Sequence, residues 1–180
     1  MIAVGQGGLT LEDHRQRLAR IEPDDAELAR LEKNVCGHLA RLGYRRVPLA
    51  LRRDIVRCIL STQDYKPFFW IEGRLPFCWN DPKDWDKDYI KYQWGHLNPR
   101  NSVTNGNGKV EDLCLMSARC NNHIQSSLPI RDLEEYFEGS ATGRRIQQVS
   151  KKRKKLFASR DWQRVSKELT RTRRVGPSAN

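Results

Sequence analysis

Hydrophobic residues recur three or four positions apart along the first third of the chain, which is the spacing of one buried helix face. The clearest stripe begins after Pro23, ends before Gly43, and predicts a helix over 24–42. A similar stripe predicts a helix over 48–60, and a start resembling a capping box predicts a shorter one over 10–21. The first stripe consists of Leu28, Leu31, Val35, Leu39 and Leu42.

The pattern changes after Tyr65, where aromatic and β-branched residues gather in short runs. Runs at 68–71 and 75–79 predict two strands around a turn, and runs at 89–94 and 110–116 predict two more on either side of a loop rich in Asn and Gly. Helices are predicted again over 118–127, 129–137 and 144–169, with a disordered end over 171–180. The sequence therefore predicts an α+β fold in a mostly helical small domain.

This pattern divides the chain into three regions. Residues 1–62 form an N-terminal helical region, 63–140 hold the strands and a candidate site, and 141–180 form a basic helix and a disordered tail. A length of 180 residues suits one domain.

Composition bears on the expected cellular location of the protein and on the state of its cysteines. No apolar run reaches the 18 or so residues of a membrane span, and the N-terminus lacks the basic start and apolar core of a signal peptide. We therefore expect a protein that is not secreted, makes no membrane contact, and lies in the cytoplasm, or in the nucleus if the source is eukaryotic. Five cysteines without a Cys-x-x-Cys pair fit reduced thiols. Buried core cysteines are favoured over a structural zinc site made by Cys78, Cys114 and Cys120.

The net charge of +11 is concentrated in one segment. Residues 141–180 hold 13 Lys or Arg and two acids, whereas residues 1–140 hold 20 of each sign. Such a block attracts a polyanion and releases its counterions, although an isolated basic run is also the usual composition of a solvated tail. The nucleic-acid contacts expected from this segment are Lys151, Lys152, Arg153, Lys154 and Lys155.

Chemistry-bearing residues cluster between positions 92 and 123. His96 ends an aromatic, strand-like run, a loop rich in Asn and Gly follows, and a helix is predicted to open with Cys120-Asn121-Asn122-His123. Imidazole supplies a base near neutral pH, and an Asn amide oxygen is a hard acceptor that suits Mg²⁺. A hairpin and helix that bring the two together would meet the needs of metal-assisted phosphodiester hydrolysis.

This stretch resembles the HNH, or His-Me finger (ββα-metal), endonucleases. Their common motif reads Asp-His-Ile-x-Pro, then a loop, then Asn-Leu-x-Leu-Leu-Cys-x-x-Cys-Asn. Here the segments 95–99, 112–116 and 120–121 take the three parts, and the resemblance covers about residues 88–127. His96 lies 16 positions before Asp112 and 25 before Asn121, which suits a compact finger of this kind.

The resemblance implies a role for each matched residue. His96 would be the general base, and Asn121 the first ligand of Mg²⁺ (or Mn²⁺), with a second ligand among Asn122, His123 and Gln125. Asp112, in place of the usual Asn, would hold the loop or orient His96. Gly95 replaces an Asp or His that often binds the metal, as in the nonspecific nuclease branch, where Gly-His follows Asp-Arg and one Asn holds the metal. Arg100 and Arg119 flank the site as phosphate clamps or as ordinary surface residues.

The leading functional interpretation is a DNA endonuclease of restriction, phage or mobile-element type, with DNA favoured over RNA and a homodimer left open. The alternatives are a noncatalytic nucleic-acid-binding protein with a degraded finger, and a component of a nucleoprotein assembly. His14 and His38 are expected to be structural and far from the motif. The N-terminal helical region is expected to be a scaffold, with a DNA-groove role for five of its arginines as the alternative: Arg45, Arg46, Arg52, Arg53 and Arg57.

Overall fold

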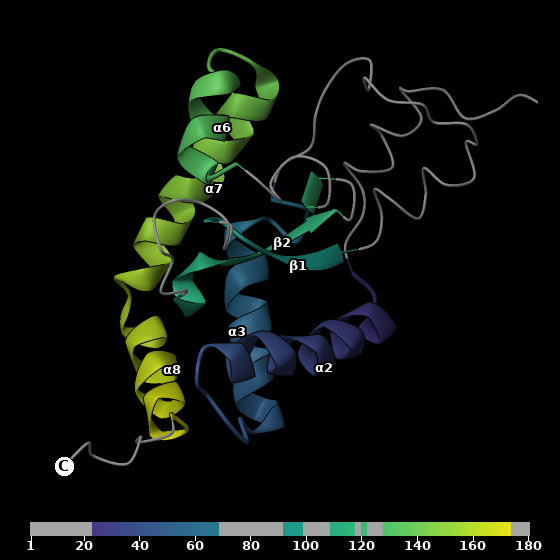
Figure 1. Ribbon diagram of the computed structural model, residues 1–180, viewed down its shortest axis with the longest axis vertical. Coiled ribbons are helices and arrows are strands. Elements are labelled where there is room, and N and C mark those ends of the chain that lie inside the picture. Colours follow the sequence, from purple (N-terminus) through teal and green to yellow (C-terminus); the bar gives the residue numbers. More distant parts are fainter. Residues whose placement is uncertain (1–22, 69–91, 99–108, 118–119, 122–127, 174–180) are drawn as a thin grey trace, which may run out of the picture.

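Helices make up most of the folded chain, and one two-stranded antiparallel sheet accompanies them (Figure 1). The computed structural model describes residues 23–68, 92–98, 109–117, 120–121 and 128–173. Within these ranges it has five helices and two strands, so the predicted mostly helical α+β class is confirmed at that level. Among those helices, none combines the length and the apolar character that crossing a bilayer requires.

Helix α2 (Asp25–Arg41) forms where its sequence signals predict. Asp24 is the N-cap, and its side chain accepts a hydrogen bond from the backbone N–H of Glu27 at 2.7 Å. The cap satisfies one of the amide groups that the first turn leaves unpaired. The buried face holds Leu31, Val35 and Leu39, so the predicted apolar stripe is confirmed as the face that packs inward.

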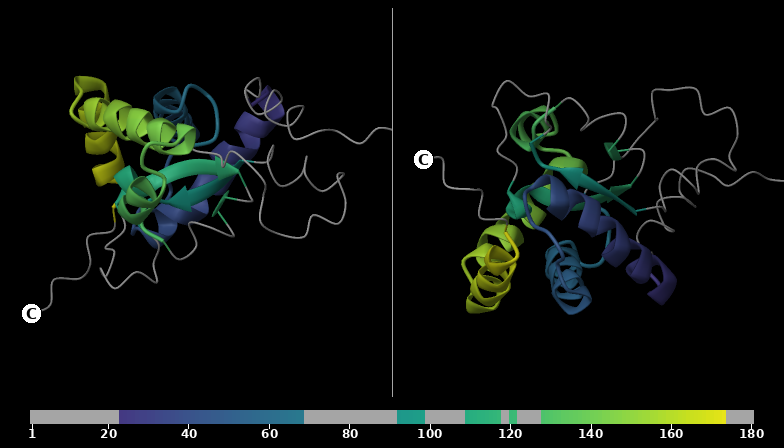
Figure 2. Two further views of the ribbon diagram at one scale, coloured as in Figure 1. Left: turned by 90° about the horizontal axis from the view of Figure 1, so that it is seen from above. Right: turned by 60° about the horizontal axis from the view of Figure 1, so that its bottom comes forward.

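Helix α3 (Leu49–Thr62) is the central element of the helical part. It contacts α2, the strand β2 and the two C-terminal helices, and Figures 1 and 2 show it between α2 and α8. Leu51, Ile55 and Ile59 are buried on it, as the spacing predicts. Two of its arginines contact α2, as the scaffold interpretation expects: Arg52 donates to the carbonyl of Glu32 and Arg53 pairs with the Glu32 carboxylate.

Strands β1 (Tyr92–His96) and β2 (Leu113–Ser117) pair with Trp94 opposite Leu115 and His96 opposite Leu113. Side chains alternate between the two faces of a strand, so this register sorts the hairpin into two sides. Trp94, Leu113 and Leu115 enter the main core, whose other members come from α2, α3 and α8 except for Val47 and Val110. Cys114 and Met116 enter a second cluster with Phe68 and residues of the C-terminal helices.

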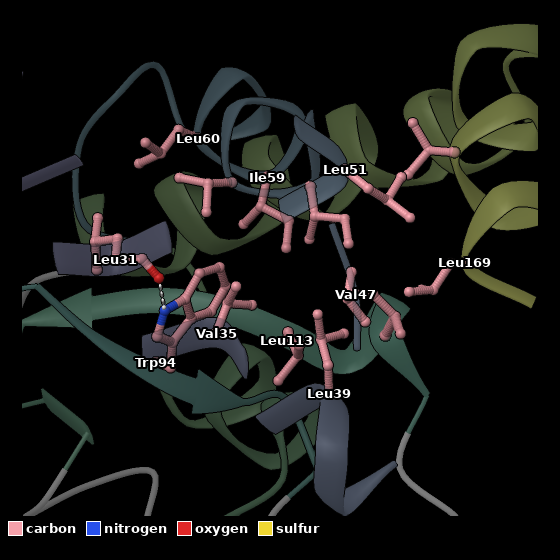
Figure 3. Close-up of a cluster of buried hydrophobic side chains, with 14 of the residues drawn as sticks. Leu31, Val35, Leu39, Val47, Leu51, Ile59, Leu60, Trp94, Leu113 and Leu169 are labelled. Carbon is pink, nitrogen blue, oxygen red and sulfur yellow. Dashed lines mark hydrogen bonds between the residues drawn. The ribbon is translucent and has the colours of Figure 1, made fainter. Parts of the chain in front are cut away.

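Trp94 ties the sheet to α2 (Figure 3). Its indole N–H donates to the backbone carbonyl of Leu31 at 3.1 Å, and its ring is only 6% exposed. Figure 3 shows the indole among the aliphatic side chains of the main core. A buried indole needs such an acceptor, because an unpaired N–H in an apolar core is costly.

Gln63 closes the outer edge of β2. Its side-chain amide donates to the carbonyl of Leu115 at 2.8 Å and accepts from the Leu115 N–H at 3.0 Å. The backbone N–H of Phe68 also donates to the Leu115 carbonyl, at 2.9 Å. The amide of a fully buried Gln thus supplies the hydrogen bonds that a neighbouring strand would supply.

The basic segment, predicted to be helical over 144–169, is helical but folds as two helices, α7 (Ala141–Phe157) and α8 (Arg160–Arg171), with a break that the prediction did not contain. Ser159 ends the first and caps the second, because its hydroxyl accepts from the N–H of Trp162. The predicted disorder from Arg171 was wrong for its first residues. Arg173 forms a β-bridge with Tyr44, which ties the end of α8 to the segment after α2.

Other boundaries shift by a few residues. Val110–Asp112 is a short 3-10 helix, so β2 begins three positions later than predicted. The predicted helix over 129–137 is α6 (Ile130–Tyr136). The predicted helix over 10–21 and the strands at 68–71 and 75–79 lie wholly or mostly outside the described residues, as does the start of the strand predicted over 89–94.

Candidate functional site

The candidate site lies where β1 ends. His96 is the last residue of the strand, and the chain leaves the sheet through Leu97, whose N–H donates to the carbonyl of Asp112 at 2.8 Å. The His96 side chain is partly exposed. His96 is thus a partly exposed imidazole at a strand end, and the residue that follows it is held by the opposite strand.

Asn121 lies against the residue before that histidine. A Cβ built on Gly95 would lie 2.7 Å from the Asn121 side-chain oxygen and 3.4 Å from the Met116 sulfur. Real Cβ atoms essentially never approach another atom as closely as the first of these distances. Glycine at this position therefore leaves room for the Asn121 carboxamide. The preceding residue, Cys120, is also helical and is buried in the second cluster, so it holds Asn121 in position.

Gln93 fixes the orientation of the Asn121 carboxamide. The Asn121 amide nitrogen donates to the Gln93 side-chain oxygen at 3.2 Å. Gln93 and Gly95 are two positions apart on β1 and therefore lie on the same face of the strand. The Asn121 side chain lies against both of them on that face. With its nitrogen committed, the carboxamide keeps its oxygen, the atom that suits a hard cation, as the remaining acceptor.

The pleat sends the His96 side chain to the other face of β1, the face of Trp94. The His96 ring lies 5.3 Å from the ring of His38 on α2, and the His38 ring lies 6.2 Å from the indole. The imidazole and the carboxamide therefore flank the end of one strand from its two sides. The sequence interpretation had expected the hairpin and the helix to bring these two side chains together, but they lie on different faces of the strand.

His38 is not remote from the motif, so that expectation was wrong. A position 58 residues earlier in the chain gave no sign of this proximity, because α2 folds back along β1. His38 also contacts Arg41, whose guanidinium lies 3.0 Å from Nδ1 of the His38 ring. Guanidinium has no acceptor, so this contact is a hydrogen bond when Nδ1 carries no proton, which describes a neutral His38.

Asp112 holds the loop between the strands. Its two carboxylate oxygens accept from the Asn98 amide and from the Lys109 N–H, both at 3.2 Å. Together with its carbonyl, which accepts from Leu97, the residue joins the end of β1 to the start of β2. The sequence left two roles open for Asp112, holding the loop or orienting His96. These contacts are those of the first role.

The basic residues of α7 divide by burial. Lys151, Lys154 and Lys155 are exposed, whereas Arg153 is 3% exposed and donates to the carbonyls of Glu111 and Leu113 at 2.6 and 2.7 Å. Burial lowers the pKa of the Arg153 guanidinium. The expectation that Arg153 contacts nucleic acid was wrong, because its donors point into the domain and hold the start of β2.

Lys152 faces a carboxylate. It forms an ion pair with Asp64, which also accepts from Arg145 at 3.0 Å. Partial burial would raise the pKa of Asp64, but the hydrogen bonds from Lys152 and Arg145 outweigh it and hold that pKa below its usual range. Lys152 thus pairs with the turn that follows α3, in addition to any surface role.

Several predicted residues lie outside the described part of the chain: Asn122, His123, Gln125, Arg100, Arg119 and Cys78. The two predicted zinc-site cysteines that are described, Cys114 and Cys120, are buried in the second cluster. Burial raises the pKa of the Cys114 thiol to about 12, so this side chain stays protonated at neutral pH.

We expect Gly95→Ala to weaken metal binding about 10- to 100-fold, the loss typical when the shell around a metal ligand is disturbed. The added methyl group would displace the Asn121 carboxamide, which is the side chain nearest to it. Isothermal titration with Mn²⁺ measures the effect, with thermal melting to show that the fold is kept. In an Asn121→Ala background the same glycine change should cost nothing further. A full additional loss in that background would contradict the mechanism.

No protein-family model matches this chain, and neither the curated proteins nor the solved structures compared with it gave a match. The functional assignment therefore depends on the geometry and chemistry described above.

Proposed function

We propose that this protein is a metal-dependent endonuclease that hydrolyses phosphodiester bonds of DNA. The observation that carries the proposal is the packing of Asn121 against Gly95, directly before His96 at the end of β1. In the His-Me finger family, which this stretch resembles, the residue before the general base is often a metal ligand, and the Asn of the following helix is another. The two positions that would share a metal are therefore in contact here, although one of them has no side chain.

The residues at this place suit Mg²⁺ or Mn²⁺. Asn121 would hold the ion through its amide oxygen, because Gln93 already takes the amide nitrogen. The Asn121 carboxamide itself occupies the space that a side chain at Gly95 would fill, and Mg²⁺ readily completes its coordination with water. When bound, the ion would supply charge stabilisation at the scissile phosphate and its leaving oxygen.

His96 would take a proton from the attacking water. It lies on the face of β1 opposite to Asn121, so a phosphate that both side chains contact would have to lie beyond the last residue of the strand. Asp112 acts indirectly, because it positions the segment that follows His96.

Exposed basic residues support a nucleic-acid partner. Lys151, Lys154 and Lys155 lie on the outer side of α7, and the whole net charge of the chain comes from its last 40 residues. A localised positive surface attracts the phosphate backbone without regard to base sequence. Cleavage specificity would come from other contacts.

Incubation of purified protein with supercoiled plasmid tests the proposal. We expect conversion to the open circular form with Mg²⁺ or Mn²⁺, no conversion in EDTA, and recovery when the metal is returned in excess, because the charge of the ion is part of the mechanism. Gel densitometry over time gives the rate. Equal conversion in EDTA and in Mg²⁺ would contradict the metal-dependent mechanism.

The second candidate function is noncatalytic nucleic-acid binding. The absence of a side chain at Gly95 and the placement of His96 and Asn121 on different faces of β1 favour it. A protein of this kind would bind plasmid with similar affinity whether or not His96 is present, and would not nick it under any metal condition.

A further inference from the structure

A polar pocket lies between α2 and β1, next to the candidate site. Its volume is about 410 Å³, and it is open to solvent. Five of its seven lining residues come from α2 and two from β1: Arg30, Asn34, Gly37, His38, Arg41, Gln93 and Trp94. Except for the edge of the indole and one glycine, the walls are hydrogen-bonding or cationic groups, which is unlike the apolar lining of most small-molecule pockets.

Arg41 gives the pocket its positive charge. It is exposed, lies in the last turn of α2, and contacts the ring of His38. Arg30 differs, because it forms an ion pair with Glu27. Among the described residues no carboxylate pairs with the Arg41 guanidinium, whereas Glu27 balances that of Arg30.

The remaining groups suit an anion that accepts several hydrogen bonds. His38 lines the pocket, and its Nδ1 lies 3.0 Å from a guanidinium nitrogen of Arg41. Asn34 is exposed on α2 and has an amide N–H₂ group. Guanidinium and carboxamide donors around an open cavity recognise phosphate oxygens.

Two lining residues connect the pocket to the candidate site. Gln93 holds the carboxamide of Asn121 at 3.2 Å, and the His38 ring lies 5.3 Å from that of His96. The pocket therefore borders the strand end from the α2 side. If the scissile phosphate of a nucleic-acid chain lay at the end of β1, a neighbouring phosphate of the same chain would lie over α2.

We propose that this pocket, defined by Arg41, His38, Asn34 and Gln93, binds a backbone phosphate of the nucleic acid adjacent to the one that is cleaved. The proposal rests on the proposed function for the position of the strand, but its ligand chemistry depends on the pocket alone. It assigns α2 a role in substrate binding that its sequence pattern, that of a scaffold helix, did not indicate.

Fluorescence anisotropy with a labelled DNA oligonucleotide in EDTA tests this proposal separately from catalysis. We expect Arg41→Gln to weaken binding about tenfold, as for a lost charge-assisted hydrogen bond, and to lower the slope of log affinity against log salt by about one phosphate contact. Lys33→Gln is the matched control, because Lys33 is exposed on the same helix, carries the same charge and does not line the pocket. It should change affinity less than about twofold, since screening weakens distant surface charges.

The outcomes separate this inference from the proposed function. A tenfold loss for Arg41→Gln alone, with unchanged melting temperature, supports the pocket even if plasmid nicking is never observed. Equal affinities of the two variants would overturn it even if nicking depends on His96. A titration with inorganic pyrophosphate distinguishes the source of the phosphate. Arg41-dependent binding of pyrophosphate without Arg41-dependent binding of DNA would assign the pocket to small phosphate compounds and overturn the proposal.

Discussion

Plasmid nicking by the His96→Ala variant should be about 10²- to 10⁴-fold slower than by the wild-type protein, the usual contribution of a positioned general base. The substitution removes the imidazole at the end of β1 and leaves the hydrogen bond between Asn121 and Gln93 in place. Its side chain is partly exposed and belongs to neither hydrophobic cluster, so the fold should be kept. The rate of supercoiled plasmid loss with Mg²⁺ measures the effect.

Two controls make this result specific. DNA affinity in EDTA should match that of the wild type, since the base does not provide the electrostatic attraction. His38→Ala removes an imidazole only 5.3 Å away and should slow nicking much less, because the proposed mechanism gives that ring no contact with the attacking water. If His38→Ala abolished nicking while His96→Ala left it intact, the base would have to be reassigned to α2.

Gly143→Ala should lower the free energy of unfolding by about 3 kcal/mol, the upper range for overpacking. Alanine normally stabilises a helix relative to glycine. Here the added Cβ would lie 2.1 Å from the carbonyl oxygen of Phe137 and 2.8 Å from its carbon, both backbone atoms. The turn is further fixed because the Ser140 hydroxyl donates to that same carbonyl at 2.6 Å and accepts from the Gly143 N–H at 2.9 Å. Either α6 or α7 must shift to admit the methyl group.

Gly37→Ala is the matched control for this prediction. Gly37 is exposed within α2, and a Cβ there would meet only the far end of Arg41, at 4.0 Å. This change should stabilise the protein by about 0.5–1 kcal/mol. Urea unfolding followed by circular dichroism compares the two. Stabilisation by both substitutions would show that the α6–α7 turn adapts and that the close approach is not a constraint.

The α2 and α3 helices could be predicted because several local signals agree in each. A cap or a proline precedes each stripe, the apolar spacing is regular, and a turn follows. The break between α7 and α8 was missed because charged residues dominate the segment and hide the stripe. Ser159, three positions before Trp162, was the available signal, a serine placed to cap a new first turn.

The candidate site could be predicted only in part. The order of His96, Asp112 and Asn121 along the chain identified the hairpin and the helix start, and Gly95 was noted only as a missing ligand. The structure shows why a glycine suits this position, because a Cβ there would lie 2.7 Å from the side-chain oxygen of Asn121. Gln93 and His38 were missed for another reason. Their roles depend on contacts with Asn121 across 28 positions and with His96 across the α2–β1 packing, which no local pattern encodes.

The amide clamp of Gln63 on β2 also limits how the molecule can self-associate. A bare strand edge offers its free N–H and C=O groups to any other chain, which leads to strand exchange or fibre growth. At Leu115 both groups are already occupied by an internal side chain. A dimer built by continuing the sheet past β2 would therefore first have to expel a buried glutamine.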